Sequence, residues 1–167
     1  MALSFKLSVA LLLAVLAAAA ATAAAAGGCQ KNKKITVQNL CGHDLPLTLT
    51  RLANSDPIFG DNTNVHVLRH GTHAEFPVCW WTGRLDAPGA PQTEFHLGVD
   101  GGAWYMAPNA QPGQAVPVTV TPHTTRGALQ GHCPAVGCPR HGVCFQHAVP
   151  GGNCHNVDEI KIIYCSP

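Results

Sequence analysis

The chain has 167 residues, of which ten are Lys or Arg and nine are Asp or Glu, so its formal net charge is +1. A charge this sparse and balanced argues against nucleic acid as a partner, because nucleic-acid recognition normally requires a clustered basic surface. The length suits one ordinary domain. Lys31, Lys33 and Lys34 form one small basic cluster, which we interpret as a solvated face in preference to a polyanion site.

The first residues have the pattern of a secretory signal peptide. Lys6 precedes an apolar run that begins at Leu7 and becomes mostly alanine in its second half, ending in small residues. The run is nearly long enough to anchor the chain in a bilayer, but its small-residue end is typical of a cleavage site. We therefore expect a signal peptide over 1–26, a single domain over 27–167, and no membrane anchor after cleavage.

Short alternating segments then recur between turn residues. The first two, 34–40 and 45–50, are expected to pair as a hairpin across the turn at 42–44. Before Cys133, no ten residues combine helical periodicity with an absence of Pro and Gly. The pattern predicts an all-β domain, either a sandwich or a barrel. Further strands are predicted, in chain order, over 65–68, 74–78, 93–99, 103–106 and 115–121.

Eight cysteines lie outside the predicted leader, five of them within the last 35 residues. That last stretch is rich in Pro, Gly and His and has little apolar periodicity, so it must be held by covalent bonds or by a metal. An even set of cysteines in a secreted chain predicts four disulfides, and eight cysteines allow 105 pairings. Each disulfide would stabilise the fold by about 2–5 kcal/mol.

A metal site is the alternative explanation for this stretch. Cys133, Cys138, His141 and Cys144 have spacings of the kind that zinc ligands use, and the His70–His73 segment is a candidate for a surface metal. The cysteines are expected to be oxidised to disulfides and not to bind zinc, and the histidine segment is expected to be a solvated loop. No metal, no cofactor and no catalytic nucleophile are therefore predicted; no Gly-x-Ser-x-Gly motif occurs.

Several passages resemble one known family. The strand at 93–95, the passage 116–127 with its Thr-Thr-Arg-Gly end, and the cysteine spacing over 133–154 are similar to motifs of the plant thaumatin-like (pathogenesis-related 5) proteins. The two ends, 35–41 and 162–167, resemble the first and last strands of that family. The resemblance implies a disulfide-stapled β-sandwich or flattened barrel, of the small single-domain type that lacks the family's second disulfide-rich domain.

The resemblance also implies disulfide partners. In the family a bond joins the first strand to the last, and the usual partners of two further cysteines lie in the missing domain. The implied pairs are Cys41 with Cys165, Cys144 with Cys154, and Cys133 and Cys138 with Cys29 and Cys79 in an order left open.

Larger members of the family carry an acidic cleft made from one arginine, one glutamate and three aspartates, linked there to β-glucan binding and weak hydrolysis. Glu94 matches the glutamate, and Arg84 lies in a loosely aligned segment. Ala103 and Met106 stand at two of the aspartate positions, and the third is in the missing domain. Asp100 is the nearest carboxylate in sequence, but glycines around it predict a turn. Because glycoside hydrolysis ordinarily needs two flanking carboxyl groups, no enzyme is predicted.

The candidate binding residues are this partial cleft together with aromatic and histidine side chains. Trp104 and Tyr105 could also stack on sugar rings, but tryptophans beside a cysteine more often pack over a disulfide, so core packing is favoured. The candidate residues are Glu94, Arg84, Asp100, Trp80, Trp81, His70, His73 and His141.

These features predict a monomeric, secreted, non-catalytic plant defence protein of the antifungal, pathogenesis-related type, located in the apoplast. Its expected partner is a cell-wall polysaccharide or a microbial surface, bound through the sheet face and loops. The alternative is a proteinaceous inhibitor of microbial glycoside hydrolases such as xylanase, in which a histidine from 70–73 or 141–147 enters the cleft of the secreted microbial enzyme.

Overall fold

The computed structural model describes residues 30–60, 63–109, 114–140 and 144–167. Residues 31–167 form one compact unit, and every helix or strand within the described ranges is a β-strand. These strands are β1 (Lys33–Asn39), β2 (Leu45–Arg51), β3 (Val65–Leu68), β4 (His73–Val78), β5 (Trp81–Asp86), β6 (Thr93–Leu97), β7 (Ala103–Met106), β8 (Val118–His123), β9 (Gln130–Gly131), β10 (Val136–Cys138), β11 (Ala148–His155) and β12 (Glu159–Tyr164).

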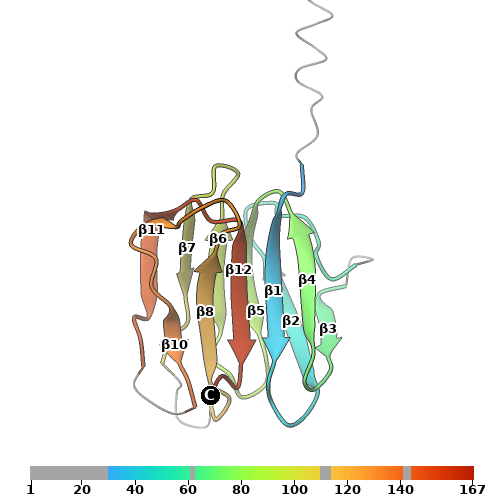
Figure 1. Cartoon of the computed structure of the whole chain (residues 1–167). Coiled ribbons are helices and arrows are strands. Elements are labelled where there is room, and N and C mark those ends of the chain that lie inside the picture. The colour runs from blue at the N-terminus through green and yellow to red at the C-terminus, as the bar shows by residue number, and fades with distance from the viewer. Residues whose placement is uncertain (1–29, 61–62, 110–113, 141–143) are drawn as a thin grey trace, which may run out of the picture. The chain divides into compact units, whose positions relative to one another are not determined.

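The strands form two sheets that lie face to face (Figure 1). One sheet has five strands in the order β10-β8-β12-β1-β4, and the other has seven in the order β3-β2-β5-β6-β7-β11-β9. Apolar residues alternate along most strands and point between the sheets, as in β12, where Ile160, Ile162 and Tyr164 are buried and their neighbours are half-exposed. The predicted all-β, disulfide-stapled sandwich is therefore confirmed.

The first and last strands lie side by side. β1 pairs with β12 in parallel, with Ile35 opposite Ile160 and Asn39 opposite Tyr164. A disulfide joins Cys41 to Cys165 just beyond this pair, and the two Cα atoms are 5.0 Å apart. The closing bond that the family resemblance implies is therefore present.

The predicted hairpin between the first two strands is wrong. β1 pairs with β12 and β4, whereas β2 pairs with β3 and β5 in the other sheet. The turn between them carries the chain from one sheet to the other, and Asn39 stabilises the crossing through its side-chain amide, which donates to the carbonyl oxygens of His43 at 2.9 Å and Leu68 at 3.0 Å. Alternation reveals that a segment is a strand, but it does not reveal which strand pairs with it.

Three of the four implied disulfide pairings are wrong: the bond between Cys144 and Cys154, and the bonds that join Cys133 and Cys138 to Cys29 and Cys79. The structure pairs Cys133 with Cys154 and Cys138 with Cys144. The pairing of β9 with β11 places Gly131 opposite Cys154 and so brings Cys133 to it. Cys138 ends β10 in the five-stranded sheet, away from β11. Cys79 is also disulfide-bonded, and Cys29, the cysteine proposed as a partner, lies outside the described residues.

Two buried tyrosines differ in their hydrogen bonding, although both side chains are fully buried. The Tyr105 hydroxyl donates to the carbonyl oxygen of Pro134 at 2.7 Å. The Tyr164 hydroxyl has no hydrogen-bond partner among the described residues, and the nearby Thr93 hydroxyl donates to the Leu85 carbonyl. We expect Tyr105→Phe to lower the free energy of unfolding by about 1 kcal/mol and Tyr164→Phe to change it little. Urea unfolding of both variants would check this, and equal losses would contradict it.

The same burial predicts a loss of stability at alkaline pH. Burial raises the pKa of both the Tyr105 and the Tyr164 phenols well above the ordinary value. Above about pH 10 the folded state therefore keeps phenol protons that the unfolded state loses. The contribution of the two phenols to the free energy of unfolding is complete below that pH and declines as the pH rises further. Urea midpoints measured between about pH 8 and pH 11 should fall less steeply in Tyr105→Phe than in the wild type. An identical slope in both proteins would contradict the assignment.

Candidate functional site

Charged, polar and aromatic side chains that could bind a ligand gather on the outer face of the seven-stranded sheet, which is the face turned away from the other sheet. Strand register aligns them in two adjacent rows that run across the strands. The first row contains Thr50, Arg84, Glu94 and Met106, and the second contains Thr82, His96 and Trp104. We call these seven residues the outer-face rows.

Arg84 and Glu94 form the charged centre of the first row. They lie opposite each other on β5 and β6, and Arg84 Nε donates to Glu94 Oε2 at 2.6 Å. The side chains are 42% and 18% exposed respectively, so the ion pair contributes at most about 1 kcal/mol to stability. Its main consequence is orientation, because the contact holds both polar groups at fixed positions on an accessible face.

His96 and Trp104 form an aromatic pair in the second row. Their rings are nearly parallel, with an interplanar angle of 11° and centroids 6.3 Å apart. Both residues are half-buried, so the sheet supports the rings while part of each stays accessible. His96 was absent from the sequence-based candidates, and Trp104 was considered there but interpreted as core. The alternation of β6 and β7 was the available signal, because it puts both on the same face as Glu94.

A further polar contact lies beside the first row. Gln92 Nε2 donates to Asp86 Oδ1 at 2.7 Å, and Asp86 follows Arg84 on the same face of β5. Neither residue was among the sequence-based candidates. The outer face therefore presents two carboxylates, of Asp86 and Glu94, each of which already accepts a hydrogen bond from a neighbouring side chain.

Asp100 does not join Glu94. It lies in the tight turn after β6, where its Oδ1 accepts a hydrogen bond from the Gly102 amide at 2.9 Å, which agrees with the turn predicted from the glycines. Its charge acts on Lys33 instead. Burial lowers the pKa of Lys33 and the nearby charge of Arg126 lowers it further, while Asp158 and Asp100 partly offset both effects.

The basic cluster is not a uniformly solvated face. Lys33 is only 7% exposed, and its Nζ donates to the Val157 carbonyl oxygen at 3.3 Å. Lys34 forms an ion pair with Glu75 at 2.8 Å, and this hydrogen bond raises the pKa of Lys34. The interpretation of a solvated face is therefore wrong for Lys33, whose side chain folds against the end of the sandwich.

The adjacent tryptophans have different surroundings. Trp81 is fully buried and stacks on Phe95 with ring centroids 5.0 Å apart, while its Nε1 donates to the Asp56 carbonyl at 3.0 Å. Its candidacy as a binding residue is therefore wrong, and the competing interpretation of core packing is confirmed. Tyr105 is buried in the same way. Trp80 is half-exposed beside the disulfide-bonded Cys79.

The histidine candidates lie elsewhere. His70 and His73 flank the turn before β4 and are exposed. The His70 amide donates to Asp44 Oδ1 at 2.8 Å, and its ring Nδ1 contacts the Cys41 carbonyl oxygen, so this ring is tied back onto the loop. His141 lies outside the described residues. Across the described part of the chain, no three His, Cys, Asp or Glu side chains converge as a metal site.

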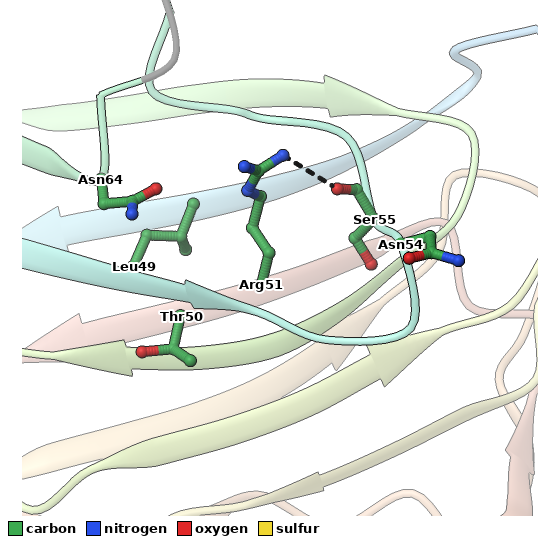
Figure 2. A pocket seen from close by; sticks show the side chains of 6 residues that line it. All are labelled: Leu49, Thr50, Arg51, Asn54, Ser55 and Asn64. Carbon is green, nitrogen blue, oxygen red and sulfur yellow. Dashed lines mark hydrogen bonds between the residues drawn. The ribbon is translucent and has the colours of Figure 1, made fainter.

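A polar pocket opens beside the end of β2 (Figure 2). Its volume is about 400 Å³, within the size range of small-ligand sites. In Figure 2 the side chains of Leu49 and Arg51 lie on the same side of the strand as Ser55 and Asn64, and Thr50 points to the opposite side. The lining residues are Leu49, Thr50, Arg51, Asn54, Ser55 and Asn64. All of them except Leu49 are polar or charged. None of the six was a candidate from the sequence.

Comparison with known proteins identifies no family. No family model and no curated protein matches the chain. A solved structure, that of the protein elicitor MoHrip2 from Magnaporthe oryzae, is similar with a TM-score of 0.49 and 13% sequence identity, over 80% of this chain and 99% of that chain. Likeness at this level carries no conclusion about activity. The thaumatin-like resemblance therefore stays a prediction from sequence motifs.

No helix among the residues that the structure describes has the length and apolar character needed to cross a bilayer. Every cysteine in those residues is disulfide-bonded. Disulfides of this number are typical of proteins that fold in oxidising compartments.

Proposed function

We propose that this chain is a secreted, non-catalytic defence-type protein that binds a cell-wall polysaccharide through the outer-face rows. The observation that carries the proposal is the half-exposed His96–Trp104 pair beside the Arg84–Glu94 ion pair. A sugar ring has an apolar C–H face that packs on an aromatic ring, and hydroxyl groups at its edge that need donors and acceptors. An aromatic platform next to fixed polar groups supplies both.

A binding role accounts for the carboxylates better than hydrolysis does. A glycosidase ordinarily needs one carboxyl group as acid and a second as base or nucleophile. Here Glu94 Oε2 accepts from Arg84 at 2.6 Å and Asp86 Oδ1 accepts from Gln92 at 2.7 Å. Both groups are thus engaged in holding the face in shape, and incubation with polysaccharide is expected to release no reducing ends.

The disulfides support secretion of the chain to an oxidising compartment. They occur mainly in proteins exported to oxidising surroundings, and the predicted leader over 1–26 would direct the chain there. A plant apoplast, where the chain would meet cell walls, is consistent with this chemistry and with the motifs that resemble the thaumatin-like family.

The test is a pull-down on insoluble β-glucan, chitin and xylan. The wild type is expected to bind at least one of them, and Trp104→Ala is expected to weaken that binding by about tenfold, which corresponds to about 1.4 kcal/mol. Lys161→Ala is the matched control, because Lys161 lies on the five-stranded sheet and its loss should leave binding unchanged. Failure of the wild type to bind any of the three, or equal binding by Trp104→Ala, would contradict the proposal.

A further inference from the structure

We infer that the free edge of β3 pairs in antiparallel orientation with β3 of a second copy of this chain, which makes the protein a homodimer instead of the monomer expected from the sequence. β3 is the outermost strand of the seven-stranded sheet and lies at the right-hand margin of Figure 1. The outer-face rows lie on β2, β5, β6 and β7. The dimer contact therefore uses a different surface, and it does not depend on the proposed binding of polysaccharide.

The two sheets that the structure describes have four edge strands, and β3 is the least protected of them. Natural sheets block pairing between molecules with short edge strands, prolines, charges or covering segments. β9 has two residues, β10 is covered by the bridge between Val136 and Gln146, and β4 contains Glu75 and Pro77. β3 has the sequence Val-His-Val-Leu, with no Pro, Lys, Arg, Asp or Glu. Its edge is therefore open to another strand.

The backbone of β3 presents hydrogen-bonding groups at this edge. The Leu49 amide donates to the Asn64 carbonyl oxygen at 2.7 Å, so Asn64 directs its backbone groups toward β2. This direction alternates along an antiparallel strand, so the N–H and C=O groups of Val65 and Val67 point away from β2. The Thr63 hydroxyl donates to the Val65 carbonyl oxygen at 3.2 Å, and a carbonyl oxygen can accept a second hydrogen bond. A second strand can therefore bond to this edge.

The side chains of the same two valines are exposed. Val65 is 54% and Val67 58% exposed, and both lie on the outer face of the sheet, with Val67 opposite Pro46. When two β3 strands pair about a two-fold axis at His66, Val65 of each copy lies opposite Val67 of the other. Both pairs exchange backbone hydrogen bonds, and the four valines pack as one cross-strand apolar cluster.

The charges near the strand permit this pairing of a copy with itself. In the same register Leu68 lies opposite Asn64 of the second copy, and Arg69 lies opposite Thr63, so no like charges of Lys, Arg, Asp or Glu face each other. His66 faces its own copy, and an ordinary histidine is mostly uncharged above about pH 7. A two-fold contact needs a surface that fits itself, and β3 meets that requirement.

Sedimentation equilibrium of the disulfide-bonded mature protein at about pH 7.5 tests the dimer. Pairing of two short edges buries little surface, so we expect weak association with a Kd on the order of 100 µM. The weight-average mass of the wild type should rise toward twice the monomer mass between about 10 µM and about 1 mM protein. Val67→Lys puts a charge into the apolar cluster and should weaken association at least about tenfold. Val99→Lys is the matched control, because Val99 is 64% exposed in the turn after β6 and should associate like the wild type.

Amide hydrogen exchange measured by NMR locates the contact. The Val65 and Val67 amides point to the free edge, whereas the His66 amide points to β2. At about 1 mM protein about four fifths of the chains would be paired, so exchange of the two valine amides should slow by up to about fivefold relative to dilute protein. Exchange of the His66 amide should not change with concentration.

Three results would each overturn the inference: a wild type that stays monomeric up to about 1 mM, equal association of Val67→Lys and the wild type, or a dimer whose valine amides exchange as fast as in the monomer. None of them affects the proposed function, which the pull-down tests separately. Because the Val67 side chain is exposed, Val67→Lys should fold, and its thermal midpoint provides that check.

Discussion

Replacing Cys41 and Cys165 together with alanine is expected to lower the free energy of unfolding by about 5 kcal/mol. The bond joins residues 124 positions apart, and cross-linking so long a loop removes a large part of the conformational freedom of the unfolded chain. It also lies beside the parallel pair of β1 and β12, whose strands come from opposite ends of the sequence. Without the bond, the chain must close that loop before the five-stranded sheet can form.

The short disulfide provides the matched control. Cys138 and Cys144 are six positions apart, so their replacement by alanine is expected to cost only about 2 kcal/mol by the same loop-closure argument. Urea unfolding followed by tryptophan fluorescence would measure both losses. A smaller loss for the long loop than for the short one would contradict the assignment of Cys41–Cys165 as the main covalent constraint.

Gly83→Ala is expected to lower the free energy of unfolding by about 3 kcal/mol, because the new methyl group has no space. A Cβ at this position would lie 2.3 Å from the Thr50 carbonyl oxygen and 2.5 Å from the Trp81 ring. The first contact obstructs the pairing of β5 with β2, and the second displaces a fully buried tryptophan from its stack on Phe95. The substitution therefore disturbs both the strand pairing and the packing of the core.

Gly42→Ala is the control for this substitution. A Cβ at Gly42 would meet no atom within 4 Å, so the same chemical change should alter stability by less than about 0.5 kcal/mol. Thermal and urea unfolding of both variants give the comparison. Equal stability of the two alanine variants would mean that β5 does not pack as closely against β2 and Trp81 as the structure describes.

The binding face shows where prediction from the sequence succeeds. Glu94 and Arg84 were candidates, and the structure brings them into contact at 2.6 Å. Asp100 was a candidate because it is near Glu94 in sequence, yet it lies in the turn after β6, where its charge acts on Lys33. His96 was missed, although the alternation of β6 places it on the same face as Glu94. Sequence proximity is a poor guide across a turn, whereas alternation is a good guide within one strand.

The amino-acid order alone is sufficient for the strand-rich class, the approximate position of most strands and the turn at Gly98–Gly102, because these depend on local periodicity and on turn residues. Strand partners, the pairing of Cys133 with Cys154, and the pocket around Arg51 depend on the tertiary structure. Each requires segments distant in sequence to meet, and many pairings of short alternating strands satisfy the same local pattern. Burial of the two inner faces and the strand register select among them, and so also decide which polar side chains share the outer face.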